Sequence, residues 1–356
     1  MVIDTFTAAN TAKGFFSYFD DVLYTEGAER IYLIKGGPGC GKSTFMKKVA
    51  SHFIDKGSDV ERIHCSSDRN SLDGIIIKDS KIAIIDATPP HSYDMKYPGA
   101  VEEIIDFSIF WDDKKLKEKQ EEIKILTDTI SSRYRSVYSL LKAAGNIEAK
   151  KQMVFEPNLD TEKILKAIKK LMKQNAVFSK TGTGKVTNRF LCAFSGDGIY
   201  TFSKTIEDIC DGYAVLDDSL NVGYVFLQKA AFLFVKTGYD IIKIHSPLFP
   251  ESRPTAIIIP ELRFGFISAG NMFSPALKEE KIIKKIPMKT FLDKDFYSSN
   301  KNKMNFEKKL IKEIISAVCS ELNEIKALHD DLEKIYIEAI DYDKVNSFTE
   351  DFVKNL

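Results

Sequence analysis

The chain has 356 residues, 44% of them hydrophobic and 29% charged, which is ordinary for a folded protein in water and leaves room for two domains. Lys and Arg together number 51, as do Asp and Glu, so the formal net charge is zero and gives no signal for a nucleic-acid partner. The longest apolar stretch, residues 224–235, is interrupted by Gln228 and Lys229 and is too short to cross a bilayer.

The five cysteines are scattered along the chain and form no C-x-x-C pair. This spacing argues against a zinc site or a disulfide framework and indicates a reducing compartment. Residues 1–14 lack the basic and apolar regions of a signal peptide. We therefore expect a cytoplasmic protein with no membrane partner.

Residues 36–44 match the phosphate-binding pattern G-x-x-x-x-G-K-[ST] in full. The apolar run Ile31–Ile34 before them predicts a buried strand, and apolar residues at a spacing of four after them predict one face of a helix. When a strand precedes such a loop and a helix follows it, the backbone N–H groups of the loop surround phosphates and the helix dipole favours their negative charge. The sequence thus predicts a nucleoside triphosphate site.

The residues of this loop have distinct expected roles. Lys42 is expected to reach the β- and γ-phosphates, and Ser43 to ligate Mg²⁺. Cys40 is interpreted as a small residue that fits the loop, and the alternative is a reactive thiol whose pKa is lowered by Lys42 and by the helix N-terminus. The predicted cofactor-binding residues are Gly36, Gly37, Pro38, Gly39, Cys40, Gly41, Lys42, Ser43 and Thr44.

A second strand supplies a carboxylate for the metal. Residues 81–85 are largely apolar and are followed by Asp86, which we expect beside the loop, where it would hold Mg²⁺ through a water. Hydrolases often carry a glutamate directly after this aspartate to activate water, but Ala87 and Thr88 follow here. The general base is therefore missing from its usual place.

Other residues are candidates for that base. Asp68 follows a predicted strand, near the edge where strand ends meet a ligand. His91 lies in a proline-rich loop just after Asp86, where it either packs the loop or faces the γ-phosphate. Glu102 and Glu103 are interpreted as the start of a helix or its exposed face.

The sequence repeats itself at an offset of 181 residues: His64 aligns with His245 and Gly57 with Gly238. The apolar stripe of a predicted long helix keeps the same offset. Its members Ile123, Ile130, Tyr134, Val137 and Leu141 align with Met304, Ile311, Ile315, Val318 and Leu322. A repeat of this length indicates duplicated domains rather than solenoid units.

We therefore predict an α/β fold, a tandem duplication of a P-loop NTPase-like core in which each copy is followed by a long helical hairpin. The first hairpin is expected to consist of helices over residues 113–144 and 160–175. The hairpins would pack against each other or hold a protein partner. The predicted divisions are residues 1–111 (active core), 112–178 (first hairpin), 186–296 (degenerate core) and 297–356 (second hairpin).

The second phosphate loop is absent. The offset places residues 36–44 on residues 217–225, where no lysine or hydroxyl stands at the matching positions and where Asp217 and Asp218 would repel a polyphosphate. We expect a structural or regulatory second repeat and one triphosphate per chain, with a rearranged site using Lys229 or Lys236 as the alternative. A second repeat that has lost its own site would supply a cation to the first site, and Arg253 or Arg263 is the candidate.

Several stretches beside the loop carry a family resemblance: residues 10–15, 65–68, 71–74, 86–91, 97–101 and 259–262. Together they resemble an uncharacterised family of two-repeat P-loop ATPases from spore-forming, low-GC bacteria. The resemblance implies the duplicated fold and nucleotide binding, and it implies no substrate. Many members carry a phosphate loop in both halves, so the loss here is a departure that leaves a second active site unsupported.

Three functions fit these residues. The first, which we favour, is an ATPase with ATP and Mg²⁺ as cofactors, in which hydrolysis at the first repeat moves the helices. The second is a small-molecule or nucleotide kinase, since residues 36–42 also resemble nucleotide-kinase loops and the glutamate after Asp86 is missing. The third is a non-catalytic nucleotide sensor, which needs no base.

Overall fold

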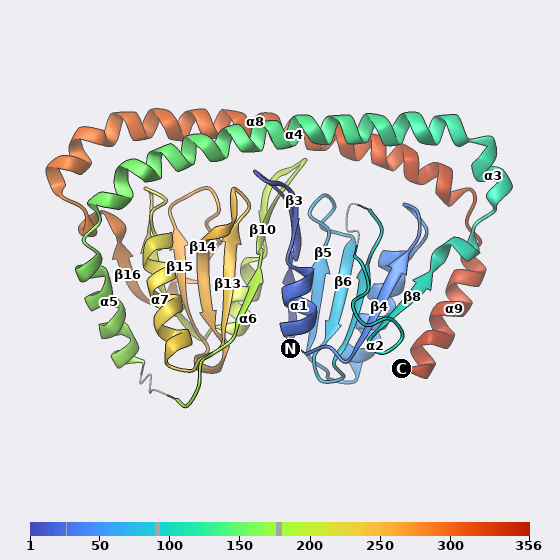
Figure 1. Cartoon of the computed structure of the whole chain (residues 1–356), viewed down its shortest axis with the longest axis horizontal. Coiled ribbons are helices and arrows are strands. Elements are labelled where there is room, and N and C mark those ends of the chain that lie inside the picture. The colour runs from blue at the N-terminus through green and yellow to red at the C-terminus, as the bar shows by residue number, and fades with distance from the viewer. Residues whose placement is uncertain (26, 90–92, 176–179) are drawn as a thin grey trace.

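Two mixed α/β cores lie side by side beneath two long antiparallel helices (Figure 1). The computed structural model describes residues 1–25, 27–89, 93–175 and 180–356. Each core is built on a six-stranded sheet, and both sheets have the same strand order along the chain. The molecule is therefore a duplicated α/β architecture.

The first sheet is parallel except for one strand, which runs antiparallel to both of its neighbours. Its order is β1 (Val2–Thr5), β5 (Val60–His64), β6 (Leu72–Ile77), β7 (Ile82–Asp86), β4 (Arg30–Lys35) and β8 (Glu102–Asp106), with β6 antiparallel. The same core contains the hairpin β2 (Ala8–Thr11) and β3 (Gly14–Ser17), helices α1 (Phe19–Thr25) and α2 (Lys42–Asp55), and the short turn η1 (Phe107–Phe110). Glu102 and Glu103 thus begin a strand, where a helix was expected.

The second sheet repeats this topology. Its order is β9 (Val186–Arg189), β13 (Ile241–Ser246), β14 (Phe249–Ile259), β15 (Phe264–Ala269), β12 (Gly212–Asp217) and β16 (Ile282–Pro287), with β14 antiparallel. The hairpin β10 (Cys192–Ser195) and β11 (Gly198–Thr201), helices α6 (Ser203–Ile209) and α7 (Tyr224–Lys236), and the turns η3 (Pro260–Leu262), η4 (Glu279–Lys281) and η5 (Met288–Phe291) complete it.

Long helices follow each core: α3 (Asp113–Glu118), α4 (Gln120–Phe155) and, after the turn η2 (Glu156–Asn158), α5 (Thr161–Gln174) follow the first, and α8 (Lys294–Ile337) and α9 (Tyr342–Asn355) the second. The helix expected over residues 113–144 is interrupted at Lys119 and continues eleven residues further, to Phe155. Gly145 lies inside α4 where the helix passes close to the first core: a Cβ at Gly145 would lie 3.1 Å from that of Ala12.

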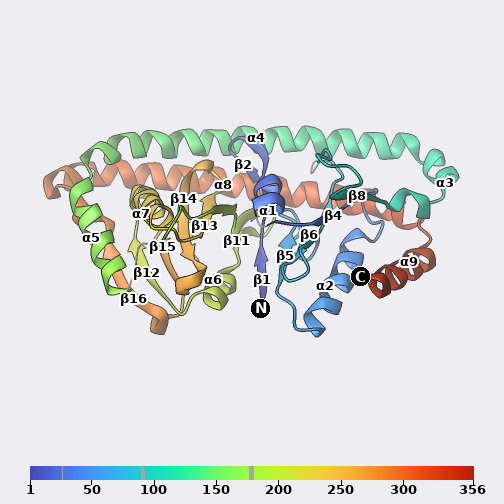
Figure 2. The same ribbon diagram turned by 60° about the horizontal axis from the view of Figure 1, so that its bottom comes forward.

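The expected hairpins do not form within each repeat. Instead α4 packs along α8, and α5 and α9 each pack on the core of the other repeat (Figures 1 and 2). The exchange is reciprocal: Asp341 N–H donates to Phe110 O at 2.8 Å, and Asp160 N–H donates to Phe291 O at 2.8 Å. The reason is length, since a helix of 36 residues spans about 54 Å and carries the chain from one core to the other.

The two cores meet through their edge strands. Phe6 and Phe190 exchange two backbone hydrogen bonds of 2.9 Å each. Next to them, the buried carboxylate of Glu61 pairs with the guanidinium of Arg189 at 2.6 Å. One apolar cluster continues across this junction from the first core into the second. The duplicated halves are therefore joined both at their centre and through the exchanged helices.

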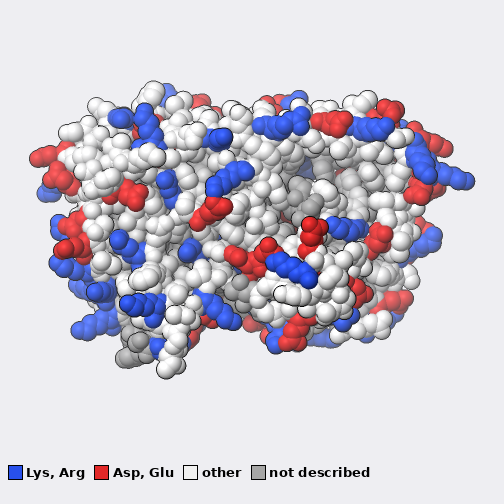
Figure 3. All heavy atoms as spheres, in the orientation of Figure 1, with Lys and Arg blue, Asp and Glu red and all other residues white. Residues whose placement is uncertain are grey.

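Charged side chains of both signs are intermixed on the face shown in Figure 3, in keeping with the zero net charge. None of the helices in the described ranges is both long enough and apolar enough to cross a membrane.

Candidate functional site

The glycine-rich loop of residues 36–41, called the first loop here, connects β4 to α2 at the end of the first core that faces the long helices. Gly39 and Gly41 adopt φ values of 67° and 91°, a region that side chains disfavour. The backbone N–H groups of Gly39, Gly41 and Ser43 have no hydrogen-bond acceptor among the residues that the structure describes. Donors of this kind at the start of a helix are suited to an anion.

Lys42 turns back into the first loop. Its Nζ donates to Gly36 O at 2.9 Å and to Gly37 O at 2.7 Å, and it lies 3.5 Å from Oδ2 of Asp86. Its side chain is only 11% exposed. The ammonium is thus held at the mouth of the loop by carbonyl dipoles and one carboxylate.

Asp86 is the last residue of β7, which pairs in parallel with β4 and sets Asp86 opposite Ile34. Its Oδ1 accepts a hydrogen bond of 2.9 Å from Thr88 N–H, and the Thr88 hydroxyl donates to Gly36 O at 3.0 Å. These bonds orient the carboxylate toward Lys42. The pairing of β4 with β7 therefore brings Asp86 close to Lys42, which follows β4 across the first loop.

Ser43 and Thr44 occupy the first turn of α2. The Ser43 hydroxyl accepts a hydrogen bond of 2.9 Å from Leu72 N–H, which fixes its oxygen between α2 and β6. Thr44 is exposed. Ser43 is the residue of this pair that is held by the core.

Asp68 is not brought to Lys42. It follows β5, and β6 and β7 lie between β5 and β4, a separation of about 14 Å at the usual strand spacing. Its Oδ1 accepts from Asn70 N–H at 3.0 Å, and its Oδ2 lies 3.9 Å from Lys326 Nζ of α8. His91, the other expected base, lies outside the described residues.

The two remaining candidates, Glu102 and Glu103, are used structurally. The buried Glu102 accepts hydrogen bonds from Tyr24 Oη and from Tyr97 N–H, and Glu103 pairs with Arg30 on the surface. Neither contacts Lys42 or Asp86 in the described part of the chain.

Cys40 does not have the environment of a reactive thiol. It is 1% exposed, and burial raises its pKa above the usual value although Lys42 acts in the opposite direction. A low thiol pKa was the alternative expectation from sequence, and it is wrong because desolvation outweighs the nearby ammonium. Cys40 is a small residue that packs inside the loop.

The second repeat covers the first loop. A Cβ at Gly37 would lie 2.6 Å from the ring of Tyr336, and one at Gly39 would lie 3.0 Å from Ile337, both at the end of α8. Tyr342, at the start of α9, donates its hydroxyl to Gly39 O at 2.6 Å. Sequence reasoning missed these residues, because the repeat predicted the helices and not which core they contact.

Arg253 and Arg263 do not reach the first loop. Arg263 is exposed and pairs with Asp211 at 2.7 Å, and Arg253 stacks over Phe249 and Tyr224 of its own core. The described residues that the second repeat places over the first loop come from α8 and α9 instead.

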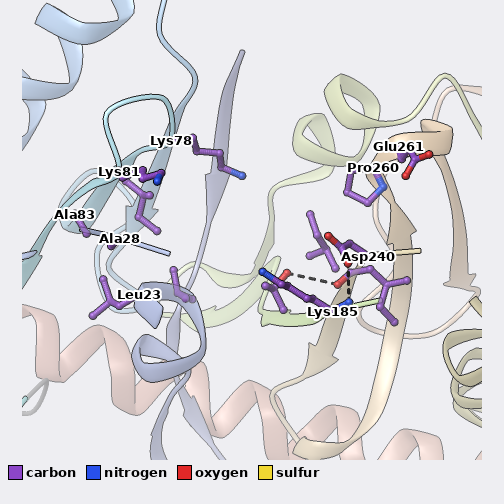
Figure 4. A pocket seen from close by; sticks show the side chains of 14 residues that line it. Leu23, Ala28, Lys78, Lys81, Ala83, Lys185, Asp240, Pro260 and Glu261 are labelled. Atoms are coloured by element: carbon purple, nitrogen blue, oxygen red, sulfur yellow. Dashed lines mark hydrogen bonds between the residues drawn. The ribbon is translucent and has the colours of Figure 1, made fainter. Parts of the chain in front are cut away.

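A hollow lies elsewhere, between the two cores at the end away from the long helices (Figure 4). It measures about 460 Å³ and is lined by Lys78, Lys81, Lys185, Asp240 and Glu261 together with apolar side chains. Lys81 pairs with Glu29, and Lys78 lies 3.9 Å from Glu61. Glu29 and Glu61 thus balance the charges of Lys81 and Lys78. Since the hollow also lies far from the first loop, we do not assign the site there.

A scan against protein-family models, a search of curated proteins and a search of solved structures each find no match for this chain. Any function must therefore be argued from the residues of the first loop.

Proposed function

We propose that the first loop binds a nucleoside triphosphate with Mg²⁺ and that the protein is an ATPase acting at its first repeat only. The observation that carries this proposal is that Lys42, Asp86 and the free N–H groups of the loop lie together at one edge of the first sheet. The ammonium would leave the Gly36 and Gly37 carbonyls for the β- and γ-phosphates. The exposed N–H groups would bind the oxygens that lie inside the loop.

The residues present fit Mg²⁺. Asp86 and Ser43 offer hard oxygen ligands from two elements that face the loop, and each is fixed by a backbone N–H. When bound, the ion would neutralise charge on the phosphates. Asp86 would also lose its pairing with Lys42 as the lysine moves to the phosphates.

A nucleotide-dependent switch without hydrolysis is the second candidate. It is favoured by the contact of Tyr336 and Tyr342 with the loop, because a ligand that reshapes the loop would move α8 and α9. Of the base candidates named from the sequence, none that the structure describes contacts Lys42 or Asp86. A kinase has no observation of its own to favour it.

Calorimetric titration with Mg-ATP tests the proposal. We expect one site per chain, and Lys42→Ala should weaken binding by about 30-fold to 1000-fold because it removes a desolvated charge paired to phosphate. Lys56→Ala, an exposed lysine at the end of α2, is the matched control and should bind as the parent does. Unchanged binding by Lys42→Ala would refute the nucleotide site.

Phosphate release then separates the functions. Free phosphate from ATP and Mg²⁺ alone supports the ATPase, and transfer only in the presence of added metabolites supports a kinase. Binding with neither, accompanied by altered hydrogen exchange in α8 and α9, supports the switch.

A further inference from the structure

The loop of residues 218–223, called the second loop here, contains a carboxylate of its own. Asp218 is 1% exposed, and both of its oxygens accept hydrogen bonds from the loop backbone: Oδ1 from Val222 N–H at 2.9 Å and Oδ2 from Gly223 N–H at 2.7 Å. The hydroxyl of Ser268, at the end of β15, donates to Oδ2 at 3.0 Å. Three donors thus converge on one buried anion.

The two loops correspond in position at an offset of 182 residues, one more than the sequence comparison used for this loop. Strands β4 and β12 both have six residues, and α2 and α7 begin at Lys42 and Tyr224. One left-handed position matches, since Gly39 has φ 67° and Asn221 has φ 58°, whereas Gly41 has φ 91° and its counterpart Gly223 has φ −60°. Asp218 therefore stands at the position of Gly36, and Tyr224 at that of Lys42.

This correspondence explains the carboxylate. In the first loop a side chain at Gly36 has no room, because its Cβ would lie 2.8 Å from Cys40 Sγ. In the second loop that position carries Asp218, whose carboxylate binds the N–H groups that correspond to those of Cys40 and Gly41. Such groups at a helix start are the ones that hold phosphate oxygens in a phosphate-binding loop.

We propose that the second loop is an oxyanion-binding cradle whose ligand is the chain's own Asp218 carboxylate. The carboxylate occupies the place of a phosphate, so the second repeat takes no nucleotide. Removal of the Asp218 carboxylate opens a site for a free oxyanion. Asp218 therefore blocks the second loop from inside, whereas the sequence predicted that it would repel a polyphosphate from the loop surface.

Charges from other elements support the buried anion. From α4, Lys151 faces Asp218 and pairs with Glu148 at 2.8 Å, and from α8, Lys308 interacts with Asp218 as well. Burial raises the pKa of Asp218 to about 7, while the two N–H donors, Ser268 and Lys151 lower it. The carboxylate is ionised at pH 8, where the test is made.

Helix α4 closes the cradle from outside. Gln152 Nε2 donates to Asn221 O at 2.7 Å, and the hydroxyl of Tyr224 donates to Glu156. The second loop is thus held in one conformation together with the end of α4. At the first loop, the end of α8 lies where the end of α4 lies at the second loop. Residues 36–41 of the first loop include no acidic residue.

The test is hydrogen exchange of the segment 217–227 at pH 8 in the full chain carrying Asp218→Ala. We expect exchange of this segment to become about 10-fold to 100-fold faster, because hydrogen bonds to a charged group are lost. Inorganic phosphate should restore protection, and chloride at equal ionic strength should not. Asp217→Ala, an exposed neighbour, is the control and should show neither effect.

The readout is local to the second loop, so failure of nucleotide binding at the first loop would leave it unaffected. Unchanged exchange in Asp218→Ala, or faster exchange that phosphate does not reverse while the first core stays protected, would overturn the proposal. If Asp218→Ala does not fold, Asp218→Asn keeps the shape and loses the charge. That variant should exchange faster than the parent in the same segment, and equal exchange would overturn the proposal.

Discussion

The ammonium of Lys42, the first residue of α2, lies 3.5 Å from the carboxylate of Asp86, the last residue of β7. The parallel pairing of β4 with β7 brings them together, because the carboxyl ends of neighbouring parallel strands open at the same edge of the sheet. If the first loop binds Mg-ATP, Lys42 must exchange this partner for phosphate oxygens. Asp86 is then released to the metal.

Asp86→Asn should therefore separate the two tasks. ATP binding without Mg²⁺ should be retained, because the loop N–H groups and Lys42 remain, and the added affinity given by Mg²⁺ and any turnover should fall about 10-fold or more. Calorimetry with and without Mg²⁺ measures this. An equal loss under both conditions would show that Asp86 does not act through the metal.

Gly37→Ala should loosen the end of α8. The new Cβ would meet the Tyr336 ring at 2.6 Å, too close for any carbon contact, so the ring has to move. We expect faster hydrogen exchange of residues 333–345. In a Tyr336→Ala background the same substitution should have a much smaller effect, and an equal effect in both backgrounds would contradict the contact.

Helix α9 should stabilise the first core, although it belongs to the second repeat. Phe348 stacks on Phe45 with ring centroids 5.9 Å apart and contacts Phe107 and Phe110 as well. Since Phe348 is half-buried, Phe348→Ala should cost about 1–3 kcal/mol of unfolding free energy, with hydrogen exchange rising in α2. Glu350→Ala on the exposed face of α9 is the control. An effect confined to the second core would contradict the exchanged helices.

The pair of Glu61 and Arg189 should make the junction between the cores sensitive to acid. Burial alone would raise the pKa of Glu61, but Arg189, helped by Lys78 and Thr5, holds it well below its usual range. The stabilisation from the ionised carboxylate is therefore complete above about pH 4.5 and is lost as the pH falls through the lowered pKa.

Glu61→Gln should thus cost about 3–5 kcal/mol near pH 7, because it removes the carboxylate charge from a buried ion pair whose guanidinium stays in place. Urea unfolding at pH 7 and pH 3 measures the effect. The deficit relative to the parent should shrink at pH 3, where the parent begins to lose the same interaction, and a constant deficit would argue against this linkage.

Much of the first core was predictable from sequence because its signals are local. The apolar run before Gly36 and the spacing of Phe45, Val49 and Phe53 predicted β4 and α2, which the structure forms. The repeat predicted a second copy of the same elements. Its offset was misjudged by one residue at the second loop, since the register there depends on strand and helix ends that the sequence comparison does not see.

The sequence by itself determined the duplicated α/β elements and the glycine loop, because hydrophobic periodicity and glycine spacing act within short segments of chain. Only the tertiary structure decided which core each long helix covers. The choice depends on the length of α4 and α8 and on the apolar surfaces that they meet across the molecule, such as Phe45 for α9. It also decided that Asp218 turns inward, since the three donors that bind it converge only once α7 and β15 are packed.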